Sequence, residues 1–281
     1  MPRFGLQYTS LISVTMGVFM TFVACGSQLY KVSMHGDSGP RPTVQSAKAG
    51  ATTASASGGK LNPNSATYGI HAPEGWVSLP IHYKFDTRMD SVQRGQIQRA
   101  MRTWETAVGK QLFNYDGIQT GVNGDSFLDL YSSLDDGING LYLDNNWAKT
   151  GKDRVVLATT IWDNESDLSD RMLTADMRYN NNDYTFGDSM VLWPEEGREV
   201  ADLQTVATHE LGHFLGLNHV ESEVDAQSIM VPSLYIGQGV TQRGISSGDI
   251  RRMQLIYGCS GSACNVEATH LKIGRLVKDP G

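Results

Sequence analysis

Three histidines in the second half of the chain have the spacing of a metal site, within the segment His209-Glu-Leu-Gly-His213-Phe-Leu-Gly216-Leu-Asn-His219. On a helix, His209 and His213 project their imidazoles from one face, one turn apart. Gly216 tolerates a positive φ and ends that helix, so that the following turn returns His219 as a third nitrogen. Three protein ligands leave Zn²⁺ one open coordination position, which is the arrangement of a catalytic site.

Glu210 follows the first of these histidines, where its carboxylate reaches a metal-bound water without binding the metal. The predicted chemistry is peptide-bond hydrolysis, with Glu210 as general base toward the water and then as proton donor to the departing amine. A bare His-Glu-x-x-His also arises by chance in ordinary helices. The added glycine and third histidine make a chance match improbable.

The extended motif resembles the signature of the metzincin zinc proteases. In that family a methionine lies in a tight turn beneath the zinc, and Met230 within Ser228-Ile-Met-Val-Pro232 fits that role. A proline two residues past the methionine resembles the matrixin branch rather than the astacin branch, which has tyrosine there. Residues 247–258 resemble the closing helix of matrixin catalytic domains, and residues 76–104 resemble their opening strand and first helix.

This resemblance covers about residues 68–258 and implies an α+β, metzincin-like fold. The expected fold has a twisted, mostly parallel sheet with an antiparallel edge strand, two long helices and a C-terminal helix. The resemblance also implies that a strand near 172–180 is the edge that pairs with an extended substrate, and that 232–235 line the adjoining pocket. The matrixin Pro-Arg-Cys-Gly switch, the His- and Asp-rich loops of the structural zinc site and hemopexin-like repeats are not found in the sequence. The chain therefore resembles a reduced, bacterial form.

Periodicity predicts the elements that must position the motif. Alternating apolar residues indicate half-buried strands, and apolar residues at helical spacing indicate amphipathic helices. Ser246 with Asp249 forms a capping-box-like start for the last helix. Strands without a repeated β-α unit favour α+β over a doubly wound fold. The predicted strands are 81–85, 127–132, 154–162 and 173–179, and the predicted helices are 90–108, 198–215 and the segment that ends near 257.

Length and charge limit the remaining possibilities. The chain has 281 residues, which fits one catalytic domain, 67–258, with appendages. Its net charge is −7 and its basic residues are not clustered, so nucleic-acid binding has no support. We expect a monomer that acts on protein or peptide substrates. The alternative is a zinc-containing surface binding or adhesion protein without proteolysis. Loss of Glu210 or of a histidine ligand would indicate such a protein, and the sequence keeps all four residues.

The N-terminal residues indicate export. An apolar run after Arg3 ends at Phe22-Val-Ala-Cys25, which resembles a bacterial lipobox. Residues 1–25 are therefore predicted to be a lipoprotein signal peptide, with Cys25 lipidated in the cell envelope, at the outer membrane; a plain secretory signal is the alternative. Residues 26–66, rich in Ala, Ser, Thr and Gly, are predicted to be a flexible tether. The competing interpretation is a propeptide, for which His35 and Asp37 offer zinc-blocking side chains.

Two further features lie outside the histidine motif. In an exported protein, Cys259 and Cys264 are predicted to form a small disulfide loop that opens the C-terminal tail, 259–281. A metal knuckle is the alternative, but only His270 lies nearby. The oxygen-rich segments 135–140 and 180–183 are candidate Ca²⁺ sites, and ordinary turn chemistry explains the same residues without an ion.

Overall fold

The computed structural model describes residues 30–33, 39–40, 62–63, 65–195 and 197–265. The predicted signal peptide with Cys25 lies outside these residues, and so does the 266–281 part of the predicted tail. In the described part of the chain, no helix is long and apolar enough to cross a membrane.

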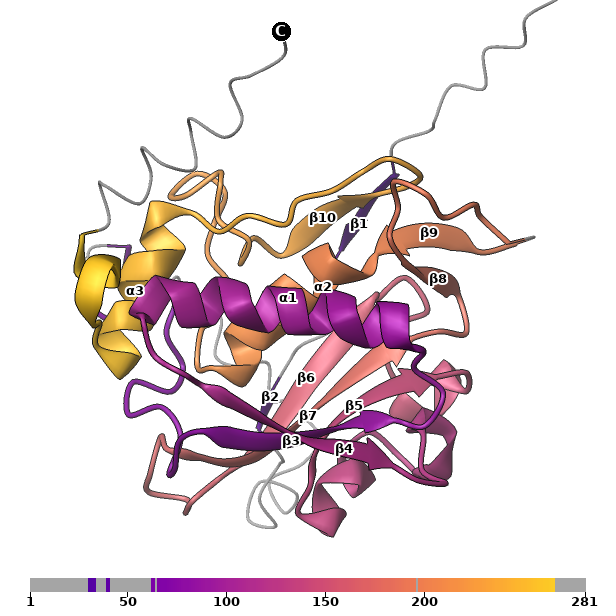
Figure 1. The fold of residues 1–281 in the computed structure, drawn as a ribbon, viewed down its shortest axis with the longest axis horizontal. Helices are drawn as coiled ribbons and strands as arrows, with labels where there is room; N and C mark the ends of the chain where they lie inside the picture. The colour runs from indigo at the N-terminus through magenta and orange to yellow at the C-terminus, as the bar shows by residue number, and fades with distance from the viewer. Residues whose placement is uncertain (1–29, 34–38, 41–61, 64, 196, 266–281) are drawn as a thin grey trace, which may run out of the picture.

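A mixed sheet forms one layer of the molecule, and the helices α1 and α2 lie against one of its faces (Figure 1). The order of its strands is β2-β6-β7-β5-β3-β4, with β6 and β7 antiparallel and the other neighbours parallel. The fold is thus α+β, with the mostly parallel sheet that the resemblance implied. The strands of this sheet are β2 (Gly39–Pro40), β3 (Ile81–Asp86), β4 (Phe113–Gln119), β5 (Asn139–Asp144), β6 (Ala158–Asn164) and β7 (Met172–Asn180).

Three helices complete the predicted framework. They are α1 (Ser91–Val108), α2 (Leu203–Phe214) and α3 (Ser247–Tyr257). Asp90 caps α1 in a capping box, and Gly109 ends it in the left-handed conformation. The buried face of α1 includes Trp104, whose indole N–H donates to the carbonyl of Thr208 at 2.9 Å. This bond fixes α1 against the helix that carries the histidines.

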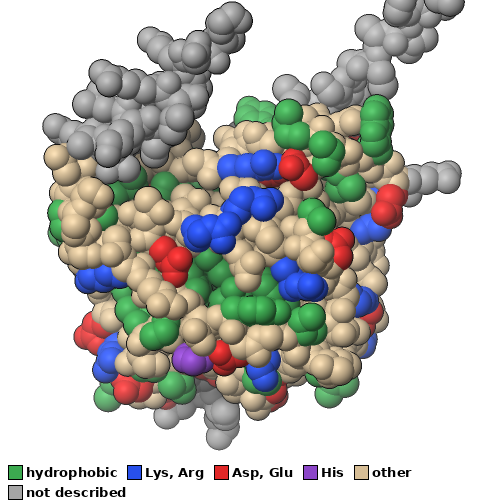
Figure 2. All heavy atoms as spheres, in the orientation of Figure 1, with side chains coloured by type: hydrophobic (Ala, Val, Ile, Leu, Met, Phe, Trp, Pro, Cys, Tyr) green, Lys and Arg blue, Asp and Glu red, His purple; other side chains and the backbone are tan. Residues whose placement is uncertain are grey.

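Short elements complete the described chain. Two further strand pairs are β8 (Tyr184–Gly187) with β9 (Glu199–Asp202), and β1 (Tyr30–Ser33) with β10 (Ser233–Ile236). The 3-10 helices are η2 (Gly124–Ser126), η3 (Tyr131–Asp136), η4 (Trp147–Thr150) and η5 (Gly261–Cys264). On the face drawn in Figure 2, basic and acidic side chains are interspersed around exposed hydrophobic ones.

Several predicted elements are wrong in detail. The segment 127–132 is no strand, because Asp129 accepts bonds from the backbone N–H groups of Tyr131 and Ser132 and starts η3. The helix predicted from 198 begins at Leu203, since the preceding residues pair as β9 and Asp202 caps the helix. The predicted edge strand, β7, lies between β6 and β5. The antiparallel strand is β6, and only the two-residue strand β2 lies between it and the edge of the sheet.

Two parts of the predicted tether, 26–66, are paired with other strands in the described structure. Tyr30–Ser33 pairs antiparallel with Ser233–Ile236, and Gly39–Pro40 pairs parallel with Ile161 and Trp162 of β6. These backbone pairings place two parts of the 26–66 segment on the folded domain. His35 and Asp37 lie outside the described residues.

Candidate metal centre

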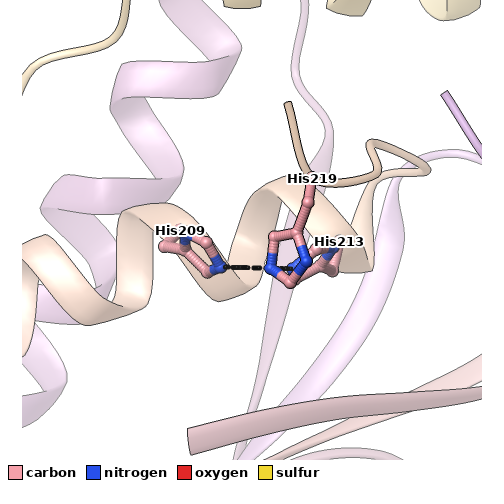
Figure 3. Close-up of side chains that lie close together, drawn as sticks. All are labelled: His209, His213 and His219. Atoms are coloured by element: carbon pink, nitrogen blue, oxygen red, sulfur yellow. Dashed lines mark hydrogen bonds between the residues drawn. The ribbon is translucent and has the colours of Figure 1, made fainter. Parts of the chain in front are cut away.

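The three histidines of the motif converge at one point (Figure 3). His209 and His213 project from α2, and His219 comes from the turn that follows. The Nε2 atom of His213 lies 3.2 Å from that of His209 and 3.1 Å from that of His219, and the third separation is 3.3 Å. Among the described residues, this is the group of His, Cys, Asp or Glu side chains with the geometry to hold one ion.

These separations fit a tetrahedral Zn²⁺ ion. Zn–N bonds of about 2.0–2.1 Å at tetrahedral angles place the ligand nitrogens about 3.3–3.4 Å apart. The Nδ1 atom of His209 lies 2.7 Å from the carbonyl of Ile229, and that of His213 lies 2.9 Å from the carbonyl of Leu217. A carbonyl only accepts, so each Nδ1 carries the proton and each Nε2 presents a lone pair to the shared point. A cation at that point relieves the repulsion between these lone pairs.

Burial keeps the imidazoles of His209 and His213 neutral. Desolvation lowers the pKa of His209 to about 4, and it lowers the pKa of His213 well below the ordinary value. The pKa of His213 is lowered further by the neighbouring His219 and His209. Neutral imidazole is the form that binds a metal, so the site is prepared for the ion at neutral pH.

The turn after α2 depends on Gly216, which has a φ of 100°. A Cβ at this position would lie 2.9 Å from the carbonyl oxygen of Ala72. The carbonyl of Gly216 accepts backbone N–H bonds from His71 and Ala72, at 2.8 and 3.1 Å. The chain thus leaves the helix close to a neighbouring segment and brings His219 back toward the other two histidines.

Met230 lies directly beneath α2. Its side chain is fully buried, and a Cβ at Gly212 would lie only 2.3 Å from the Met230 sulfur. Glycine at this position therefore allows the methionine to approach the helix backbone one residue before His213. The support role of Met230 stays a prediction, for which this contact is the structural basis.

The turn that contains Met230 is held by a buried carboxylate from α3. Asp249 accepts from the backbone N–H of Ile229 at 2.9 Å and from the hydroxyl of Ser228. Arg252 donates to the same carboxylate at 2.7 Å. Ile229 in turn offers its carbonyl to His209, so Asp249 orients a metal ligand through the backbone.

Glu210 is buried on α2 beside His209 and contacts the sheet. The hydroxyl of Thr160, on β6, lies 2.6 Å from its Oε2 atom. The predicted general base therefore lies next to the strand that borders the outer edge of the sheet. Sequence reasoning did not single out Thr160, because a threonine in a strand carries no motif.

Sequence reasoning also missed His71, which it treats as an ordinary histidine. Its Nε2 atom lies 2.9 Å from the carbonyl of His213, and its ring stacks on Trp162 with centroids 4.1 Å apart. The indole N–H of Trp76 donates to the carbonyl of Phe214 at 2.7 Å. Both side chains bond to carbonyls in the last turn of α2, and the carbonyl of His213 also accepts from the backbone N–H of Gly216 at 2.9 Å. Only the three-dimensional structure brings these distant residues to the helix.

The remaining predicted residues lie apart from the histidines. Cys259 and Cys264 are paired in a disulfide after α3. In the candidate Ca²⁺ segments, Asp136 accepts from the backbone N–H of Ile138, and Asn180 accepts from that of Asp183. Turn chemistry thus uses oxygen atoms from both segments, and Ca²⁺ binding stays a prediction.

The chain is similar to several known proteins. A family model described as matrixin matches residues 76–258. Metalloendoproteinase 2-MMP of Arabidopsis thaliana is 37% identical over 59 residues, covering 21% of this chain and 14% of that protein. Matrilysin of Felis catus is 47% identical over 53 residues, 19% of each chain. The matched segments thus span less than a fifth of these relatives. A solved structure, high choriolytic enzyme 1, a hatching enzyme zinc-protease from Oryzias latipes, aligns with 14% identity and a TM-score of 0.31, covering 64% of this chain and 90% of that one.

Proposed function

The chain belongs to the matrixin family, and we propose that it is a zinc-dependent endopeptidase. The family implies a catalytic zinc, and His209, His213 and His219 are the residues that would hold it. The observation that carries the proposal is the convergence of three Nε2 atoms within 3.1–3.3 Å, with Glu210 buried on the same helix next to His209.

The chemistry divides between the metal and the protein. When bound, Zn²⁺ acidifies a water and polarises the carbonyl of the scissile peptide bond. Glu210 accepts the proton of the attacking water at its carboxylate and then donates it to the departing amine nitrogen. The carbonyls of Ile229 and Leu217 hold the rings of His209 and His213 in the required tautomer throughout.

The substrate edge of the sheet is proposed to be β6. This strand passes beside Glu210, and only Gly39–Pro40 pairs beyond it in the described sheet. An extended peptide bound at this outer edge would lie next to the general base, with main-chain bonds supplying affinity independent of side chains. This assignment replaces the edge near 172–180, which the structure places inside the sheet.

The cellular setting is proposed from the sequence alone. Residues 1–25 act as a lipoprotein signal, and Cys25 carries the lipid that anchors an exported monomer in a bacterial cell envelope, at the outer membrane. Protein or peptide substrates outside the cytoplasm would then reach the domain. Ca²⁺ at 135–140 or 180–183 remains part of this proposal.

Metal removal tests the proposed activity. The purified full chain should contain one zinc per molecule and cleave some members of a diverse peptide pool. A chelator should abolish cleavage, and added Zn²⁺ should restore it. Full zinc occupancy without cleavage of any peptide would contradict the proposal and favour the zinc-containing binding or adhesion protein.

A further inference from the structure

The hydroxyl of Thr160 makes a short contact with the proposed general base. Its Oγ1 atom lies 2.6 Å from Oε2 of Glu210 and 3.1 Å from the carbonyl oxygen of the same residue. A hydroxyl has one proton, and the shorter distance is typical of an O–H donor bound to a carboxylate. The hydroxyl therefore donates to the side chain. Both side chains are buried, at 0% and 1% exposure, where water does not compete for the bond.

The sheet, and not the helix that carries Glu210, determines where this hydroxyl lies. Thr160 is inside β6 and is paired with Met177 of β7. Its neighbours on the same face, Ala158 and Trp162, belong to the main core, whereas Ile161 packs on the opposite face against Leu130 and Leu134. A β-branched side chain in a strand has few accessible rotamers. The hydroxyl is thus a fixed donor toward α2.

We propose that Thr160 is a positioning residue for Glu210. By holding Oε2, its hydroxyl restricts rotation of the carboxylate and keeps it aimed at the site where the proton is transferred. Correct orientation of a proton acceptor contributes to the rate and not to the affinity for substrate. This role rests on the proposed peptidase function and adds a residue from the sheet to the machinery carried by α2.

Three substitutions in the full chain separate this role from a structural one. Thr160→Val removes the hydroxyl and keeps the shape, and Thr160→Ser keeps the hydroxyl. Thr159→Val is the matched control, because Thr159 is equally buried on the same strand and faces the other side of the sheet. We expect Thr160→Val to lower kcat about 10-fold, the effect of losing one hydrogen bond to a charged group. KM and zinc content should stay unchanged, Thr160→Ser should recover most of kcat, and Thr159→Val should retain it.

A second measurement does not depend on activity. In chelator, the thermal unfolding midpoint is compared for Thr160→Val, Glu210→Ala and the double variant. Thr160→Val leaves a buried carboxylate with one donor fewer, so it should lower the midpoint more in the wild-type background than in the Glu210→Ala background. Equal shifts of the midpoint in both backgrounds would show that Thr160 and Glu210 are not coupled, and would overturn the proposal.

The kinetic outcomes separate the two proposals. If the wild type cleaves peptides in a zinc-dependent manner and Thr160→Val is as fast, the positioning role is wrong while the peptidase function stands. Parallel losses in Thr160→Val and Thr159→Val, with no recovery in Thr160→Ser, also overturn the role, since strand destabilisation would explain them. A wild type without zinc-dependent cleavage overturns both proposals.

Discussion

At the level of single residues, the position before His213 shows how closely the metal site is packed. A Cβ at Gly212 would lie 2.3 Å from the sulfur of Met230 and 3.0 Å from its methyl carbon. Alanine is otherwise preferred over glycine inside a helix, by about 1 kcal/mol. Glycine at this position lets the Met230 side chain pack against the helix backbone. This packing offsets the lower helix propensity of glycine.

Gly212→Ala should therefore destabilise the protein by about 1–3 kcal/mol, because the new methyl group displaces Met230 or shifts α2. Zinc affinity should fall as well, since His213 is the next residue. Gly95→Ala in α1 is the control, because a Cβ at Gly95 would lie 3.6 Å from its nearest neighbour, on the Arg99 side chain. That variant should be neutral or more stable. Thermal unfolding measures both variants, and equal effects would argue against a packing constraint at Gly212.

At the level of elements, α3 supports the candidate metal site without supplying a ligand. Its Asp249 carboxylate binds the N–H of Ile229, whose carbonyl binds His209. The sequence predicts α3 and its cap at Ser246, because a capping box is a local pattern. It does not predict that the capping carboxylate also holds the Met230 turn, since this contact joins segments about 20 residues apart.

Asp249→Ala should lower zinc affinity by about 10- to 100-fold, as expected when the partner that orients a ligand is lost. The protein should also lose about 2–4 kcal/mol of stability, because Arg252 and the N–H of Ile229 lose a buried acceptor. Asp225→Ala is the matched control, since Asp225 contacts Arg252 and Ser246 but not Ile229. Its zinc affinity should match the wild type in a competition titration. Equal loss of zinc affinity in both variants would contradict the inference that Asp249 orients His209 through the backbone of Ile229.

The order of the strands shows where sequence reasoning ends. Alternation in 173–179 correctly indicates a strand, and β7 is continuously buried from Thr174 to Asn180, as expected for an interior position. The expectation that this strand lies at an edge came from the resemblance and was wrong. Alternation could not correct it, because alternation does not reveal which strands are neighbours. The histidines and Glu210 are found from their spacing, and Met230 from the family resemblance. Thr160 and His71 reach the site only through sheet pairing and a long-range turn.

At the level of the whole molecule, described parts of the N-terminal segment pair with the proposed substrate strand β6 and with β10. Gly39–Pro40 occupies the outer edge of β6, and Tyr30–Ser33 pairs with β10, which follows the Met230 turn. A peptide cannot pair with the same edge of β6 at the same time. We propose that the 26–66 segment acts as a propeptide, an interpretation that these pairings support over a simple tether.

Removal of this segment should therefore raise activity. A specific protease site placed within 46–59 allows the purified full chain to be cut after folding. Cleavage and dilution should increase kcat/KM toward an extended peptide, because the competing strand dissociates. The uncut chain treated identically is the control. An unchanged kcat/KM after complete cutting would show that the segment does not restrict the edge.

The central claim is that the chain is a zinc peptidase in which Glu210 moves the proton and the histidines hold the metal. The most direct test compares bound zinc with peptide cleavage rate for the wild type, Glu210→Ala and His213→Ala. Glu210→Ala should keep its zinc and its fold and lose at least ~10²-fold in cleavage rate, because the proton acceptor is gone while the Lewis acid remains. His213→Ala should lose both zinc and activity. A Glu210→Ala variant that retains zinc and cleaves as fast as the wild type would contradict the claim.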